Sequence, residues 1–354
     1  MESGYFLQVN VNKFSGNCLG DHYNGCLIHE AIMWPQPKVS IIISAHNRPE
    51  YLMEALKSLK GQTAALDTFE VIVVKDYVLS PARINTRGMN VTFIDVTETH
   101  LVFKHMAGIK AARGSLIAFM DDDDLFASLK IERILNLSKY MDGYSFCFNE
   151  KKFFNNQLDD LSALLSVPAS GFEIFMAPDF SSRRLNRHIP WYNLSSMTMG
   201  RDLAVKGMEI LGDFRREIDP LWYLIALEYG SKIIYDSSYL TFYRRHSGGV
   251  SRSNDKEKIC IYALQAIENY AKMLHIFKKK VTIETIHVMQ AEWYIKASSL
   301  GCKMPEFNSV NTGITILKSV RNRSSKDITK LLLLFLLSRI SLKVSTNIYP
   351  KFYK

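Results

Sequence analysis

The sequence predicts an α/β fold with a mostly parallel central sheet, followed by a helical C-terminal region. Two patterns carry this prediction: short apolar runs alternate with helix-like segments over the first 125 residues, and residues 254–300 have helical periodicity. An apolar fraction of 47% and a charged fraction of 22% are ordinary for a globular chain with a core. We expect an N-terminal extension of irregular structure at 1–36, an α/β domain at 37–252 and a helical region at 253–354.

Four buried strands are expected, each a short run rich in valine, isoleucine and phenylalanine. They are Val39–Ser44, Phe69–Val74, Val91–Val96 and Leu116–Met120. One helix opens at Pro49, and a second covers 102–112 and ends at Arg113-Gly114. Ligands bind at the carboxyl ends of the strands in such sheets. The loops 44–48, 75–77 and 121–124 should therefore gather at one edge.

Charge and cysteine content narrow the class of protein. The net charge is +9, from 44 Lys+Arg against 35 Asp+Glu, which suits nucleic acid, an anionic membrane or phosphorylated substrates. The five cysteines form no C-x-x-C pair, so we expect no disulfide framework and a reducing cytosol. The N-terminus lacks a basic segment followed by an apolar stretch, which predicts no signal peptide.

Asp121 to Asp124 follow the fourth expected strand directly. Adjacent like charges repel, and aspartate is a poor strand and helix former. A hard divalent cation such as Mg²⁺ or Mn²⁺ would relieve the repulsion and accept oxygen ligands. The alternative is a solvated acidic loop in which Asp124 caps a helix.

The order and spacing of these motifs resemble those of the family 2 glycosyltransferases. The resemblance rests on four segments: Val39 to Arg48, Leu56 to Thr63, Phe69 to Asp76, and Ala112 to Met120 leading into the aspartates. It covers roughly residues 38–250. It implies a GT-A fold, which is a nucleotide-binding α/β sheet.

The resemblance implies a donor-nucleotide site. The loop after the first strand cradles the nucleoside in this family, which here implies Ser44, His46 and Arg48. The acid after the second strand accepts a hydrogen bond from the base, which implies Asp76. Lys75 stands where family members usually carry a further acid. A ring N–H facing an acceptor oxygen suits uracil, thymine or guanine, and a UDP-sugar is favoured.

The D-x-D element of the family falls on Asp121-Asp122-Asp123. The resemblance implies Asp123 as a ligand of Mn²⁺ or Mg²⁺, with Asp121 beside it. Asp121 or Asp122 would hold hydroxyls of the sugar or ribose. Asp124 is expected to cap a helix or to support the ligands.

The segment from Gly212 to Gly230 matches the family's catalytic-base motif, which is an acid, an aromatic residue and a helix that ends in glycine. Asp219 occupies the base position. The neighbouring glutamate of the family is displaced to Glu217. Alternatively, Asp219 caps the following helix, with Pro220 at its first position.

The segment that closes the domain carries further candidates. The resemblance implies that Arg244 or Arg245 contacts the diphosphate and that His246 is a third metal ligand, although a lone histidine is often structural. Metal and cations would neutralise the leaving nucleoside diphosphate while Asp219 takes the acceptor proton. The implied reaction inverts the anomeric configuration.

The C-terminal residues form a basic apolar tail. Leu331–Leu337 lies between basic residues, but spanning a bilayer takes ~20 apolar residues. An apolar stripe with lysine, arginine and aromatic residues suits the membrane interface. We expect a peripheral protein on the cytoplasmic face of a membrane, with a lipid-linked or surface glycan as acceptor. The alternative is a helix that packs on the catalytic domain or on a partner subunit.

Three other functions agree with parts of the sequence. A nucleotidyltransferase gives no role to Asp219 or to residues 243–251, and it usually has a glycine-rich first loop, which residues 44–48 lack. A catalytically degenerate scaffold is permitted by the departures at Lys75 and Ile218. Nucleic-acid binding ranks last, because the excess charge lies in the apolar tail rather than on a sheet face that carries aromatic residues.

Overall fold

The computed structural model divides into two compact units. Unit 1 comprises residues 1–174, 193–215 and 231–245, and unit 2 comprises residues 175–192, 216–230 and 246–354. The residues that the structure describes are 10–13, 34–79, 86–155, 167–181, 185, 193–245 and 255–302. The domain boundaries predicted at residues 36 and 252 stay predictions.

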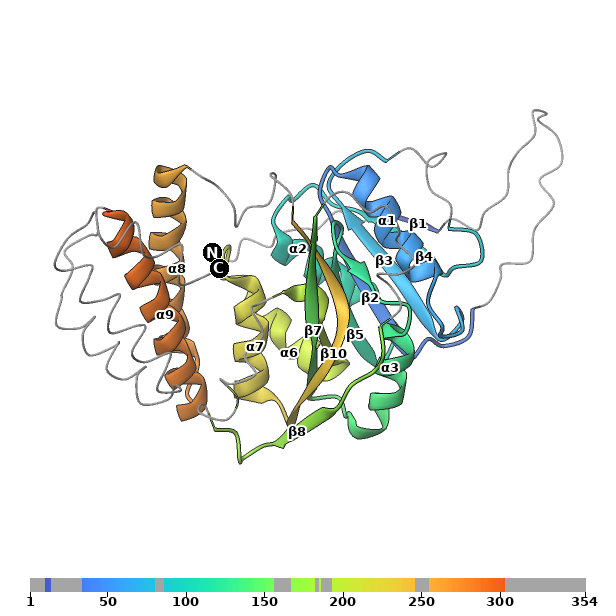
Figure 1. The fold of residues 1–354 in the computed structure, drawn as a ribbon. Helices are drawn as coiled ribbons and strands as arrows, with labels where there is room; N and C mark the ends of the chain where they lie inside the picture. The colour runs from blue at the N-terminus through green and yellow to red at the C-terminus, as the bar shows by residue number, and fades with distance from the viewer. Residues whose placement is uncertain are drawn as a thin grey trace, which may run out of the picture. The chain divides into compact units, whose positions relative to one another are not determined.

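Unit 1 is built on one mixed sheet, with strand order β1-β4-β3-β2-β5-β9-β7-β10-β6 and with β8 paired to β10 (Figure 1). Strands β4, β3, β2, β5, β7 and β10 point one way, and β1, β9 and β6 point the other. The bounds are β1 Asn10–Lys13, β2 Val39–Ala45, β3 Phe69–Lys75, β4 Val91–Asp95, β5 Leu116–Asp121, β6 Leu125–Phe126, β7 Ser145–Asn155, β8 Phe172–Met176, β9 Met197–Gly200 and β10 Lys232–Arg245. The predicted α/β fold with a mostly parallel sheet is confirmed.

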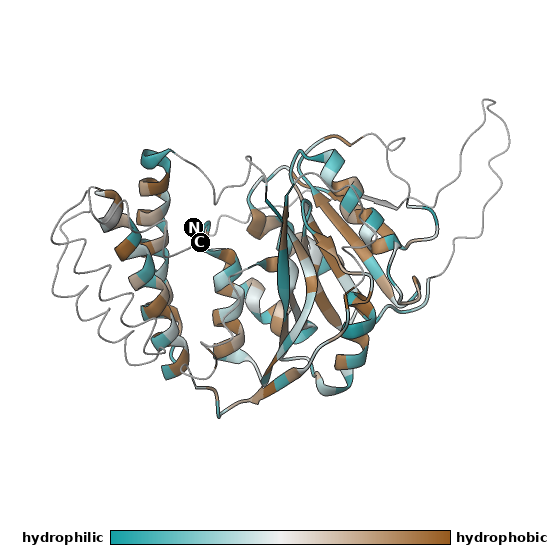
Figure 2. Cartoon of the chain, viewed as in Figure 1, coloured by the Kyte–Doolittle hydropathy of each residue, from teal (hydrophilic) through white to brown (hydrophobic). Residues whose placement is uncertain are grey.

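Helices cover both faces of this sheet. On one face, α1 (Pro49–Lys60) and α3 (Lys130–Leu137) pack their leucines and isoleucines against Ile41 and Ile43 of β2. On the other face, α2 (Leu101–Ala111) contacts β2, β3 and α6 (Arg201–Leu211). Short 3-10 turns lie at Ser138–Tyr140 and Leu194–Ser196. Strands β2 and β3 are mostly hydrophobic along their length (Figure 2), as expected for strands buried on both faces.

Helix α2 lies unusually close to the sheet. A Cβ atom at Gly108 would stand 2.4 Å from the side chain of Ile42, so only glycine lets the helix approach β2 this closely. Lys104, one turn earlier, is buried as a consequence, and its Nζ donates to the carbonyl oxygen of Ala45 at 2.7 Å.

The N-terminal extension contributes one strand to the sheet. Residues 10–13 form β1, antiparallel to β4, so the prediction of irregular structure is wrong for this segment. Strand pairing depends on a partner far along the chain, which local composition does not indicate.

The described part of unit 2 is mainly helical. It contains α7 (Ile218–Tyr229), α8 (Lys256–Ile276) and α9 (Lys280–Leu300), and the helices predicted for 254–300 are confirmed. Asp255 caps α8, because its carboxylate accepts from the backbone N–H groups of Glu257 and Lys258. Among the residues with described structure, none of the helices has the length and apolar character needed to traverse a bilayer. The predicted membrane-binding tail lies outside the described residues.

Cys260 and Cys302 form a disulfide within unit 2. The expectation of no disulfide framework is therefore wrong for this pair. The two cysteines are 42 residues apart and meet because α8 packs against α9, which the cysteine spacing alone does not indicate.

Candidate active site at the ends of three parallel strands

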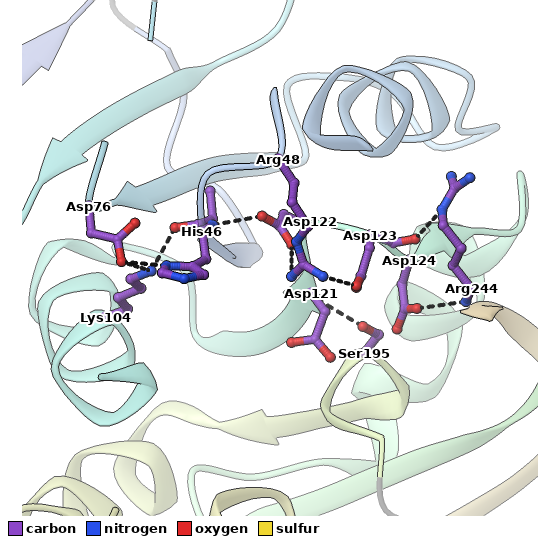
Figure 3. Close-up of polar contacts among 11 residues, drawn as sticks. His46, Arg48, Asp76, Lys104, Asp121, Asp122, Asp123, Asp124, Ser195 and Arg244 are labelled. Atoms are coloured by element: carbon purple, nitrogen blue, oxygen red, sulfur yellow. Dashed lines mark hydrogen bonds and ion pairs between the residues drawn. The ribbon is translucent and has the colours of Figure 1, made fainter. Parts of the chain in front are cut away.

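The loop after β2 is tied to the acidic turn after β5 (Figure 3). The main-chain N–H of His46 donates to Oδ2 of Asp122 at 2.7 Å. The guanidinium of Arg48 donates to the carboxylates of both Asp122 and Asp123. Asn47, between them, has a φ of 48°, a left-handed conformation that asparagine adopts more readily than most residues. This turn directs both neighbours toward the aspartates.

The four aspartates alternate in exposure. Asp122 and Asp124 are buried, whereas Asp121 and Asp123 are partly exposed, and 15% of the Asp123 side chain is accessible. The N–H of Asp124 donates to the carbonyl of Asp121 at 3.2 Å and closes the turn. The N–H of Asp121 donates to the Ser195 hydroxyl at 2.9 Å. The first and third carboxylates are therefore the ones presented outward.

Burial has the largest effect on the pKa values of the two buried carboxyls, Asp122 and Asp124. It raises the pKa of Asp122 to about 6, although Arg48 opposes this shift. Burial, with the charge of Asp123, also raises the pKa of Asp124 to about 6. For Arg48 itself, burial lowers the pKa, but the charges of the neighbouring aspartates outweigh it and the net shift is upward. The site therefore concentrates negative charge that one arginine partly neutralises.

Asp124 does not cap a helix, so that part of its prediction is wrong. It is followed by β6, and α3 begins only at Lys130. Its carboxylate accepts from Asn193 Nδ2 at 2.9 Å and from the main-chain N–H of Arg244 at 3.1 Å. Asp124 thus joins the acidic turn to β10.

Asp76 stands at the end of β3, next to the β2 loop (Figure 3). Its Oδ2 accepts from Nδ1 of His46 at 2.7 Å and from Nζ of Lys104 at 2.9 Å. Burial would raise the pKa of Asp76, but the hydrogen bonds from Lys104 and His46 outweigh it and lower the pKa. Asp76 is therefore an ionised acceptor.

Lys75 is turned toward the neighbouring strand. Its ammonium pairs with Asp95, its register partner on β4, and donates to the carbonyl of Tyr77 at 3.2 Å. The departure from the family pattern at this position is thus a cross-strand ion pair.

The two predicted diphosphate contacts differ in environment. Arg244 is almost fully buried; Nε donates to the carbonyl of Asp123 at 2.8 Å, and the guanidinium pairs with Glu54 of α1. Arg245 lies over the ring of Phe153, 4.0 Å from its centroid. His246 lies outside the described residues.

The donor set partly fits a divalent cation. Asp121 and Asp123 offer carboxylate oxygens from one turn, which is the ligand type that Mg²⁺ and Mn²⁺ prefer. Within the part of the chain that the structure describes, no three histidine, cysteine or acidic side chains are grouped to hold a metal ion. The resemblance implies three metal ligands, and the structure describes two of them, Asp121 and Asp123.

In unit 2, Asp219 lies in the first turn of α7 and is partly exposed. The alternative that Asp219 caps this helix is wrong, because the cap residue is Glu217, with a left-handed φ of 58°. The carboxylate of Glu217 accepts from the hydroxyls of Tyr262 and Tyr270, at 2.9 and 2.5 Å, and from Nε1 of Trp293, at 3.1 Å.

Sequence reasoning missed several residues that support the site. The position of Lys104 among the apolar residues of α2 was an available signal for its burial. Glu54, Asn193 and Ser195 gave no signal, because each meets its partner only through contacts between distant segments.

The fold and the site together define an α/β domain with an acidic turn at the ends of its parallel strands. Residues 40–157 match the model of glycosyl transferase family 2, and the resemblance predicted from the motifs is confirmed. This part of the chain is therefore similar to a family 2 glycosyltransferase domain. The match ends before α7, so it does not reach Asp219.

Curated relatives resemble the same part of the chain. An uncharacterized glycosyltransferase of Rickettsia bellii is 29% identical over 138 residues, which is 38% of this chain and 19% of the relative. The uncharacterized glycosyltransferase YwdF of Bacillus subtilis is 34% identical over 27% of this chain and 37% of the relative. The chain thus spans about a fifth of the length of the Rickettsia protein.

Two solved structures share the fold over most of the chain. TarS of S. aureus in complex with UDP-GlcNAc has a TM-score of 0.54 at 17% identity, covering 89% of this chain and 92% of TarS. The mannosyltransferase PcManGT of Pyrobaculum calidifontis, in complex with GDP-Man and Mn²⁺, has a TM-score of 0.52 at 13% identity, covering 89% and 84%. At these identities the likeness concerns the fold.

Proposed function

We propose that this protein transfers a sugar from a nucleotide-diphosphate sugar to an acceptor hydroxyl. One observation carries the proposal: the carboxyl ends of β2, β3 and β5 bring the His46 loop, Asp76 and the acidic turn to one edge of the sheet. Ligands bind at this edge in open α/β sheets. Relatives named glycosyltransferases, and fold neighbours bound to UDP-GlcNAc and GDP-Man, support the same class of donor.

In this proposal the donor nucleotide lies along the strand ends. Ser44, His46 and Arg48 hold the nucleoside, and Asp76 accepts a hydrogen bond from the base. Asp121 or Asp122 holds ribose or sugar hydroxyls. A UDP-sugar is the favoured donor.

Asp121 and Asp123, with His246, would hold Mn²⁺ or Mg²⁺, which supplies positive charge to the leaving diphosphate when it is bound. Arg244 and Arg245 add positive charge from β10. Arg48 already neutralises part of the acidic turn. The Mn²⁺ bound to PcManGT supports this assignment.

Asp219 is the proposed general base, on the strength of its motif. Its carboxylate takes the proton of the acceptor hydroxyl as the oxygen bonds to the anomeric carbon. The bond from that carbon to the diphosphate oxygen breaks, and the electron pair leaves with the diphosphate. A single displacement of this kind inverts the anomeric configuration.

The acceptor proposed is a lipid-linked or surface glycan at the cytoplasmic face of a membrane. The support is the basic, apolar tail around Leu331–Leu337. Deleting the chain after Arg323 and sedimenting the protein with anionic vesicles tests this part separately.

The test of the donor site is thermal stabilisation by UDP, TDP, GDP and CDP, each with and without Mn²⁺. We expect one class of nucleotide to raise the melting temperature only with Mn²⁺, and Asp123→Asn to abolish the rise. Asp67→Asn, an exposed carboxylate lost outside the site, is the matched control and should behave as wild type. If no nucleotide shifts the wild-type protein, the proposal fails and a degenerate scaffold takes its place.

A further inference from the structure

Lys104 of α2 contacts the predicted donor site through Asp76. Its side chain is 2% exposed, and its ammonium lies between Oδ2 of Asp76, at 2.9 Å, and the carbonyl of Ala45, at 2.7 Å. Burying an ammonium costs free energy unless it is paired and hydrogen-bonded. These two contacts therefore hold the Lys104 ammonium and the Asp76 carboxylate in place. Lys104 thereby fixes one oxygen of Asp76.

The two oxygens of Asp76 differ as a result. A carboxylate oxygen has two lone pairs, and those of Oδ2 are taken by Lys104 and by Nδ1 of His46. An ionised carboxylate only accepts, so this histidine nitrogen carries the proton. Oδ1 is buried and has no hydrogen-bond partner. Figure 3 shows it directed away from both donors.

Two more buried oxygens at or just after the ends of β2 and β3 lack partners. They are the hydroxyls of Ser44, at the end of β2, and of Tyr77, which follows Asp76 in the chain. Burial, together with the charges of Asp122 and Asp76, raises the pKa of Tyr77 to about 12, so its hydroxyl keeps a proton to donate. Buried polar groups without partners are rare in native proteins.

We propose that Lys104 sets the nucleobase preference of the donor site, selecting uracil or thymine over guanine. This inference rests on the proposed function. Uracil and thymine present one ring N–H, which needs one acceptor oxygen, and Oδ1 of Asp76 is the oxygen without a partner. Guanine presents a ring N–H next to an amino group, and this pair needs both carboxylate oxygens. Cytosine presents a ring nitrogen acceptor, which Oδ1 repels.

The test is titration calorimetry of UDP, TDP, GDP and CDP with the full chain in Mn²⁺. We expect the wild-type protein to bind UDP and TDP at least about tenfold more tightly than GDP or CDP, the scale set by one misplaced hydrogen bond. Lys104→Met keeps the length of the side chain and removes the ammonium. It should bring the UDP:GDP ratio to within about threefold, because Oδ2 becomes available to the guanine amino group.

Lys110→Met is the matched control, because Lys110 is exposed on the same helix, and it should keep the wild-type ratio. His46→Ala removes the other donor to Oδ2 from an exposed side chain and should shift the ratio in the same direction, which keeps a test available if Lys104→Met does not fold. Equal wild-type affinities for UDP and GDP, or an unchanged ratio in both site variants, would overturn the inference and leave the proposed function standing. Failure of every nucleotide to bind would overturn both.

Discussion

Units 1 and 2 each bury carboxylates, but they stabilise them with different partners. In unit 1, Asp76 pairs with Lys104 and Asp122 with Arg48. In unit 2, Glu217 accepts hydrogen bonds from two tyrosine hydroxyls and a tryptophan N–H, all neutral donors on α8 and α9. The first arrangement pairs each carboxylate directly with a cation, whereas the second holds the carboxylate with aromatic donors, to which Lys296 of α9 adds an attractive charge interaction.

The difference indicates different roles. A carboxylate paired with a partly exposed cation such as Arg48 can exchange that partner for a metal ion, because charge stays balanced. A carboxylate held by three directional neutral donors has no such exchange available, and it fixes the backbone that carries it. Glu217 holds a left-handed cap conformation at the start of α7, two residues before Asp219. We infer that unit 2 fixes the first turn of this helix in place.

The largest expected effect follows from removing the Glu217 carboxylate. Glu217→Leu leaves one buried and two partly buried donors without an acceptor and should lower the free energy of unfolding of unit 2 by about 3 kcal/mol or more. Glu217→Gln keeps an amide oxygen as acceptor and should cost about 1–2 kcal/mol. Urea denaturation followed by tryptophan fluorescence measures both, since Trp293 is one of the donors.

Glu257→Gln, in the exposed first turn of α8, is the matched control and should denature as wild type. Wild-type denaturation midpoints for both Glu217 variants would show that the aromatic donors do not anchor α7. The two units would then differ in the geometry around their carboxylates, and this difference would not affect stability.

The next effect in size concerns the disulfide that joins α8 to the end of α9. It closes a loop with a sequence separation of 42 residues, and such a cross-link stabilises a fold by roughly 2–4 kcal/mol, chiefly by restricting the unfolded chain. Reductant should lower the denaturation midpoint of unit 2 in the wild-type protein and leave Cys260→Ser unchanged. An equal response in both proteins would mean that Cys260 and Cys302 do not cross-link in solution.

The sequence predicts best what local patterns encode. Strands β2 to β5 are continuous buried apolar runs, and the structure places them within one residue of their predicted ends. The aspartates of the acidic turn and the polar residues after β2 were found because the ends of parallel strands must share one edge.

What the sequence did not predict depends on pairing between distant segments. Strand β1 needs β4, Cys260 needs Cys302, and Glu54 needs Arg244, which follows it by 190 residues. Glu217 looked like a displaced member of a motif, because nothing near it in the chain shows that α8 and α9 supply its donors. Such contacts follow from packing, which composition and periodicity do not specify.

The smallest effect comes from Lys130, the exception in unit 1. This fully buried ammonium donates to oxygens of Ser195 and Thr241 and lies 3.8 Å from the centroid of the Phe126 ring. Burial lowers the pKa of Lys130 to about 7, although the neighbouring Cys147, Asp124 and Asp236 oppose the shift. Lys130 is the cationic counterpart of Glu217, held mainly by neutral groups.

The pH dependence of stability follows from that shift. An unfolded lysine titrates near ~10.4, so between about pH 7 and pH 10 the unfolded chain binds more protons than the native one, and the Lys130 contribution to stability rises with pH. Below about pH 7 both states are protonated, and the native state carries the full cost of the buried charge. Lys130→Met removes this dependence, so the free energy of unfolding of the wild type should rise by about 2 kcal/mol relative to that of the variant between pH 7 and pH 9. Urea denaturation at each pH, with Lys110→Met as the exposed control, measures the gain. If the free energies of unfolding of wild type and Lys130→Met change with pH in parallel, Lys130 stays charged in the folded protein. Unit 1 would then stabilise a buried ion with neutral groups as effectively as unit 2.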